Sequence, residues 1–139
     1  MLVCINRTTA PSTLNDKEWI AADWHTSSQF MDRVYVSWTR FIFNPHNGNY
    51  VQSPIFFAYS TDGGQTFSDP TNITGNVKYD QGSRPIVGYV GIVHVIFEGL
   101  TRLAPIDSTG GLSATRTNNG CHSTTMYSKS SDGGATWST

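Results

Sequence analysis

The chain has 139 residues, a length typical of one domain, and 37% of them are hydrophobic, which is enough for a buried core. Nine Lys and Arg oppose ten Asp and Glu, and no apolar run approaches the roughly 18 residues of a membrane span, so we expect neither nucleic acid nor a membrane as a partner. The charged fraction of only 14%, together with 13 glycines, favours a β-rich protein with many tight turns and excludes a disordered chain.

The first 14 residues contain one short apolar run, at residues 2–5. This run is too short for the core of a signal peptide, and no basic stretch follows Met1. We therefore expect any export signal to lie outside this chain. The run is a candidate for the outer strand of a preceding structural repeat, which would occupy residues 1–14.

Four segments with strand character follow one another in the first half of the chain, at residues 19–22, 33–41, 53–60 and 65–68. Residues 33–41, RVYVSWTRF, alternate in the strand manner and place Val34, Val36 and Trp38 on one face. Residues 53–60 are rich in aromatic and β-branched side chains, which favour strands.

The second half repeats this order, with strand-like segments at residues 85–89, 92–97, 121–130 and 135–137. Val93, Val95 and Phe97 alternate as the apolar residues of segment 33–41 do. No segment has a sustained helical period. The links between segments differ in length, and function is expected in the long ones, which are residues 25–32, 44–52 and 99–120.

Four short antiparallel strands in a unit, written twice, are typical of the blades of a β-propeller. We therefore predict an all-β fold with a first blade at residues 15–75 and a second, truncated blade at residues 83–139. A β-sandwich is the alternative, although it would not explain the repeated order. Since propellers have roughly four to eight blades, we expect an incomplete propeller, either part of a longer protein or completed by copies of this chain. Three copies would supply six blades.

The clearest repeat is an eight-residue segment, STDGGQTF at residues 60–67 and SSDGGATW at residues 130–137. In each copy the aspartate, Asp62 or Asp132, can accept backbone N–H groups of its own turn, and the two glycines allow positive φ. The aromatic residue that ends each copy can be buried at the start of the next strand. A calcium site is the alternative, but one carboxylate in each loop is a thin ligand set. We expect a structural turn, with no metal or cofactor.

The pattern Ser-x-Asp-x-Gly-x-Thr, followed by Trp or Phe, resembles the Asp-box, or bacterial neuraminidase repeat, of sialidase-like β-propellers. The segments NDKEWIAADW, RVYVSWTRF and QGSRPIVGYVGIVHVIFEG resemble bacterial Asp-box proteins that are called exo-sialidases or glycosyl hydrolases. The resemblance covers nearly all of residues 15–139. It implies a propeller with six blades when complete, a glycan as substrate or ligand, and an extracellular or cell-surface location for the parent protein.

The resemblance also implies candidate catalytic residues. Sialidases hold the substrate carboxylate with three arginines, and use a Tyr–Glu pair as nucleophile and an Asp as general acid/base. The first arginine belongs to an Arg-Ile-Pro motif, and the nearest match here is Arg84-Pro85-Ile86, in which the isoleucine between Arg and Pro is missing. Asp107, in APIDSTGG, has the place of the acid/base. Alternatively, Arg84 only opens a strand and Asp107 is a solvated turn residue. The other arginines and the Tyr–Glu pair would lie on blades outside this chain, which we therefore expect to be inactive alone.

Asp-boxes also occur in non-catalytic propellers such as sortilin-like receptors. A module that binds glycan or protein without turnover, and a self-assembling scaffold fragment, therefore stay open as alternatives. Cys4 and Cys121 either form one disulfide or are two unrelated thiols. The four histidines have no metal-ligand spacing. The charged residues 16–18 either line a central channel or form a solvated strand entry.

Overall fold

The computed structural model describes residues 12–75, 77–102 and 121–138. Within these residues the chain forms strands and turns and no helix, which confirms the all-β prediction. The strands are β1 (Thr13–Ala22), β2 (Val34–Phe43), β3 (Tyr50–Gln52), β4 (Ile55–Ser60), β5 (Thr71–Asn72), β6 (Asp80–Val87), β7 (Val93–Arg102) and β8 (Cys121–Ser130). The candidate strand at residues 2–5, Cys4 and Asp107 lie outside the described residues.

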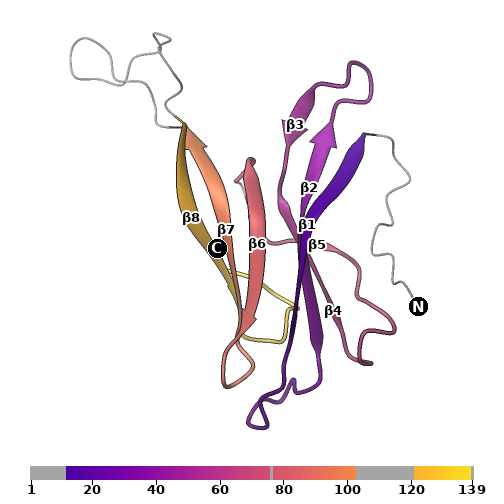
Figure 1. The fold of residues 1–139 in the computed structure, drawn as a ribbon, viewed down its shortest axis with the longest axis vertical. Helices are drawn as coiled ribbons and strands as arrows, with labels where there is room; N and C mark the ends of the chain where they lie inside the picture. The colour runs from indigo at the N-terminus through magenta and orange to yellow at the C-terminus, as the bar shows by residue number, and fades with distance from the viewer. Residues whose placement is uncertain (1–11, 76, 103–120, 139) are drawn as a thin grey trace, which may run out of the picture.

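The strands form two antiparallel sheets, one from each half of the chain. The first has the order β1-β2-β4-β5, with β3 paired to the end of β2, and the second has the order β6-β7-β8. Backbone hydrogen bonds between Lys129 and Ser138 add the beginning of a fourth strand to the second sheet. Figure 1 shows the first strand of each sheet, β1 and β6, side by side in the centre, with β8 and β4 toward the two outer sides.

The fourth strand of the first sheet lies later than the sequence predicts. Residues 65–68 are not a strand, and β5 pairs with β4 from Thr71 instead. The reason is that the backbone N–H groups of Gln65 and Thr66 are donated to Asp62 and are not available to a neighbouring strand. The chain rejoins the sheet only at Ser68, whose N–H donates to the carbonyl of Tyr59 at 2.8 Å.

Both sheets contain the same irregularity in their first strand. The register shifts between Asp16 and Trp19 in β1, and between Gln81 and Arg84 in β6. Lys17 has φ +57° and Gly82 has φ +65°, so each bulge holds one residue in the left-handed region. Trp19 pairs with Ser37 and Arg84 with Ile96, which gives Trp19 and Arg84 equivalent places in the two sheets.

The main core lies between the two sheets. It contains Tyr35, Ile55, Phe57 and Ile73 from the first half of the chain and Val93, Val95 and Phe97 from the second. Val36, Trp38 and Ala58 form a separate cluster on the other face of the first sheet, as the alternation of segment 33–41 predicts. Each Val, Ile or Phe of the main core stabilises the fold by roughly 1.5–3 kcal/mol on burial, and this core joins the apolar faces of the two sheets.

Candidate functional site

The two repeated turns, at residues 60–67 and 130–137, satisfy their own hydrogen-bonding groups. In the first, Asp62 Oδ1 accepts the N–H groups of Gln65 and Thr66 at 3.0 and 2.9 Å, and Asp62 Oδ2 accepts the Thr66 hydroxyl at 2.6 Å. Ser60 Oγ donates to Asp62 Oδ1 at 2.7 Å and accepts the N–H of Gly64 at 2.8 Å. These bonds, led by that of the Thr66 hydroxyl, hold the pKa of Asp62 well below its usual range.

The second turn repeats this network atom for atom. Asp132 accepts from Ala135 and Thr136, and Ser130 Oγ joins Asp132 to the N–H of Gly134. Partial burial would raise the pKa of Asp132, but the bonds from Thr136 and Ser130 outweigh it and lower the pKa to about 2. These hydrogen bonds agree with the predicted structural role of the turn, because both carboxylates accept them from their own loops.

The second turn also packs against the first sheet. Trp137 contacts Phe57 edge to face, with ring centres 4.5 Å apart, and its Nε1–H donates to the carbonyl of Gly134. Arg33 donates to the carbonyl of Gly133 at 2.8 Å and stacks over the ring of Tyr59. The turn therefore fastens one sheet to the other.

Arg84 is the candidate catalytic residue that the structure describes. It directly follows the bulge of β6, where its neighbours Ser83 and Pro85 are buried and Arg84 itself is exposed. Its guanidinium lies 4.6 Å from the centre of the Trp19 ring on the adjacent strand β1. Arg84 forms no ion pair with another described residue, and its side chain is exposed beside β1.

The sequence did not show that Arg84 packs against Trp19. Gly82 indicated the bulge of β6, because a glycine inside a strand often marks a bulge. Lys17, at the equivalent place in β1, gave no such indication. Residues 16–18 are all exposed on β1, which agrees with either interpretation of this charged segment. Asp107 cannot be placed beside Arg84, because it lies outside the described residues.

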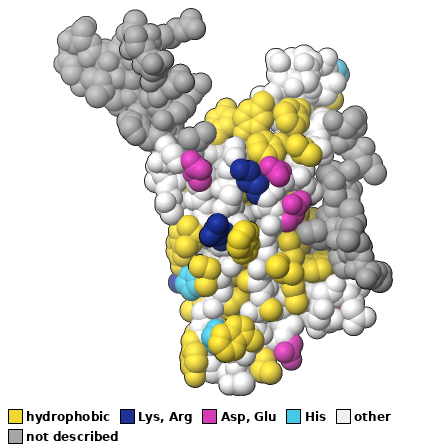
Figure 2. Space-filling view, viewed as in Figure 1, with side chains coloured by type: hydrophobic (Ala, Val, Ile, Leu, Met, Phe, Trp, Pro, Cys, Tyr) yellow, Lys and Arg dark blue, Asp and Glu magenta, His cyan; other side chains and the backbone are white. Residues whose placement is uncertain are grey.

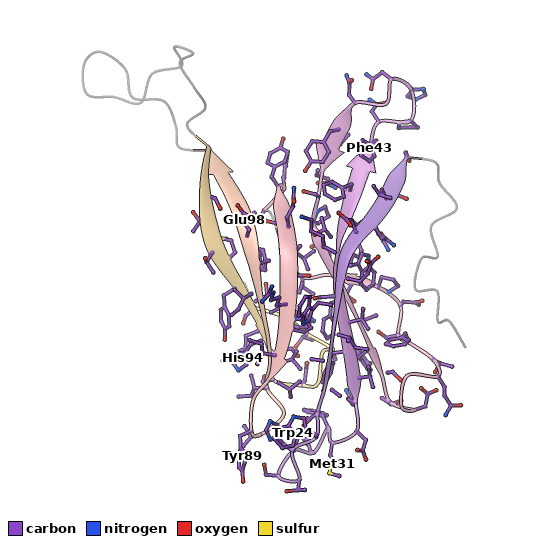
Figure 3. The ribbon with its side chains drawn as sticks, in the orientation of Figure 1. Trp24, Met31, Phe43, Tyr89, His94 and Glu98 are labelled. Carbon is purple, nitrogen blue, oxygen red and sulfur yellow. The ribbon has the colours of Figure 1, made fainter. Side chains whose placement is uncertain are left out.

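A pocket opens where β2 ends and β4 begins, at the end of the sheets away from the two repeated turns. Its volume is about 550 Å³. The described residues that line it are Phe41, Phe43, Tyr50, Ser53, Tyr79, Gln81 and Glu98. Figure 3 labels Phe43 on β2 and Glu98 on β7, on either side of the gap between the sheets. Part of this lining comes from the link 44–52, one of the long links in which function was expected.

The aromatic rings of the pocket are centred on Tyr50. The centres of the Phe41, Phe43 and Tyr79 rings lie 6.2, 6.1 and 5.7 Å from that of Tyr50, and their planes are tilted by 49°, 62° and 40° from it. The Tyr50 hydroxyl donates to Ser53 Oγ at 2.5 Å. Burial raises the pKa of Tyr50, and this hydrogen bond opposes the rise.

A buried carboxylate lies next to the pocket in the chain. Asp80 is fully buried, and its N–H donates to the carbonyl of Ser53 at 3.1 Å. Burial raises the pKa of Asp80 to about 6, while the Thr74 side chain opposes the shift. Asp80 also raises the pKa of Tyr50, so its negative charge is felt at the pocket.

The described residues hold no group of three or more His, Cys, Asp or Glu side chains suited to a metal ion. Among the histidines, His94 stacks on Tyr127 at 5.7 Å, and its Nδ1 shares a hydrogen bond with the Tyr127 hydroxyl at 2.8 Å. Nor does the described part of the chain contain a helix long and apolar enough to cross a membrane.

No family model and no curated protein matches this sequence. A crystal structure of an unknown function protein from Dyadobacter fermentans DSM 18053 is similar to it, with a TM-score of 0.54 and 16% sequence identity. The match covers 93% of this chain and 40% of that one. At this identity the similarity concerns the fold alone, and the chain spans about two fifths of the length of its structural neighbour.

Proposed function

We propose that the chain is part of a sialidase-like β-propeller that binds terminal acidic sugars of glycans at β1 and β6, the first strands of the two sheets. The observation that carries this proposal is the exposed guanidinium of Arg84, held over Trp19 without an ion pair to any described residue. A planar guanidinium pairs with a carboxylate through two parallel hydrogen bonds. The ring of Trp19 offers an apolar surface beside it, against which the carbon atoms of a sugar can pack.

The propeller part of the proposal rests on the equivalence of the two sheets. They have the same strand order, the same bulge and the same turn, and pack face to face. Ser37 and Thr39 are fully buried, but Ile96 and Glu98, in equivalent register on β7, are exposed. The second sheet therefore has room for a further sheet where the first has its neighbour. The Dyadobacter neighbour shows that this fold also occurs within a longer chain.

The test is a titration of the 139-residue chain with sialyllactose by isothermal calorimetry. We expect binding to the wild type, at least ten-fold weaker binding to Arg84→Ala, and only partial rescue by Arg84→Lys, since an ammonium cannot make the paired contact. Lys129→Ala removes an exposed cation of β8 and is the matched control, which should bind as the wild type does. Equal binding of uncharged lactose, or full binding by Arg84→Ala, would contradict the proposal.

A fluorogenic sialoside separates the catalytic version of this proposal from the non-catalytic one. The acid/base role of Asp107 and the completion of the arginine set on further blades remain predictions. We expect this chain to bind and not to turn over, because a retaining mechanism needs a nucleophile and an acid/base in one site. Turnover by this chain that is lost in Asp107→Asn would show that it is a complete enzyme.

A further inference from the structure

The pocket between β2, β3 and β6 differs from the Arg84 site in its charge. Among the residues that the structure describes, its lining contains four aromatic rings and one carboxylate, that of Glu98, and no Lys or Arg. The carboxylate of Glu98 accepts a hydrogen bond from the Ser123 hydroxyl and is paired in register with Gln81. Figure 2 shows apolar side chains gathered at this end of the molecule, with both acidic and basic side chains below them. The charged group among the described lining residues is the carboxylate of Glu98, which disfavours an anionic ligand.

The pocket is also held in shape before any ligand arrives. Phe43 of β2 is paired with Tyr50 of β3. Asn49 closes the turn between them through two hydrogen bonds, one as acceptor and one as donor. Asn44 N–H donates to the carbonyl of Asn49 at 2.8 Å, and Asn49 N–H donates to Asn47 Oδ1 at 2.9 Å. Because the side chains of the pocket are already ordered, a ligand that contacts the rings loses little of its binding free energy to side-chain entropy.

The rings pack against Tyr50 at different tilts, so the pocket is lined by both faces and edges of aromatic rings. Aromatic faces carry partial negative charge and attract cations, and several of them together recognise methylated and quaternary ammonium groups. Such a group is weakly hydrated and therefore loses its water at little cost, and a neighbouring carboxylate adds direct attraction. A neutral sugar would gain the ring contact but nothing from Glu98.

We infer that this pocket binds a quaternary or methylated ammonium group, with the rings of Phe41, Phe43, Tyr50 and Tyr79 around the methyl groups and Glu98 facing the charge. The ligand class includes choline esters, betaines and methylated amines attached to larger molecules. This inference does not depend on the proposed glycan site, because it uses none of the residues of that site.

The experiment uses choline chloride as the probe, observed by saturation-transfer NMR on the 139-residue chain. We expect choline to bind about ten-fold more tightly than 3,3-dimethyl-1-butanol, its uncharged isostere. Glu98→Gln keeps the shape and the acceptor for Ser123, and should weaken choline binding several-fold without changing the binding of the isostere. Tyr50→Ala should abolish the binding of both compounds.

Tyr89→Ala is the matched control, because Tyr89 is an exposed tyrosine in the link between β6 and β7 at the other end of the sheets. It should bind choline as the wild type does. Equal affinity for choline and its isostere, or an unchanged affinity in Glu98→Gln, would overturn the inference in favour of a plain apolar pocket. Tighter binding of methyl glucoside than of choline would overturn it in favour of a sugar site.

Discussion

The two repeated turns differ in what surrounds their glycines. The glycines of the first copy face open space, whereas those of the second pack against Phe57 and Arg33. Identical residues of the two copies therefore have different neighbours, and the difference is clearest at the glycines. Gly64 and Gly134 have the same place in the repeat and similar φ angles, +89° and +98°.

We predict that Gly134→Ala destabilises the chain more than Gly64→Ala. Both substitutions place a Cβ in the left-handed region, at a cost of about 1–2 kcal/mol. A Cβ on Gly64 meets open space, but one on Gly134 would lie 2.6 Å from Phe57 Cε1, and overpacking of this kind costs about 1–3 kcal/mol more. Urea unfolding followed by tryptophan fluorescence measures the difference. Equal losses would mean that the second turn moves off the first sheet without cost.

The sheets meet at β6 around a buried acid. Ser53 and Tyr79 form a parallel bridge there, and Asp80 brings its carboxylate into the interface. Because burial disfavours the charged form, the folded state binds a proton on Asp80 more tightly than the unfolded state does.

We predict that stability falls as the pH rises through the pKa of Asp80, which is about 6. The contribution of Asp80 to the free energy of unfolding is fully present below its unfolded pKa and is lost above about pH 6. The loss is about 2 kcal/mol between pH 4 and pH 8. Asp62 and Asp132 act in the opposite sense, since their pKa values are lowered and their contribution is lost only as the pH falls below about 4. Asp80→Asn should remove the loss on the alkaline side. An unchanged pH profile in this variant would show that another group titrates.

The strands themselves were largely predictable, because segments 33–41 and 92–97 alternate and buried faces follow from alternation. The bulges were not, since Lys17 belongs to a residue type that rarely adopts positive φ, and its pairing partner is distant in sequence. The fourth strand was misplaced because the sequence alone did not show that Asp62 takes the N–H groups of Gln65 and Thr66. Arg84 came from the resemblance, whereas the pocket joins residues of four strands and leaves no local pattern.

The outer face of the second sheet carries several exposed apolar side chains. Ile86, Ile96 and Tyr127 are 51%, 40% and 46% exposed, while the equivalent face of the first sheet is covered by the second. Arg84 and Glu98 lie on the same face, since Arg84 pairs with Ile96 in register and Glu98 is two residues further along β7. Exposed apolar side chains on a sheet face invite association.

We predict that the chain associates with copies of itself through this face. Ile96→Lys should lower the average mass seen by light scattering at high concentration, because a charge at the centre of the face must be desolvated on association. Ile20→Lys, at an exposed isoleucine of β1, is the matched control and should leave the mass unchanged. A wild-type chain that is monomeric at all concentrations would contradict the prediction.

The repeated bulge has a consequence for how such a protein can diversify. In β6 it places Arg84 on the open side while Ser83 and Pro85, on either side of it, stay buried in the sheet contact. A substitution at position 84 therefore changes what the molecule offers to a ligand and leaves the fold intact, and position 19 is its counterpart in β1. The two repeats already have different side chains at this position, an indole and a guanidinium, after the same backbone bulge. Ligand specificity can therefore change in one repeat without a change in the other.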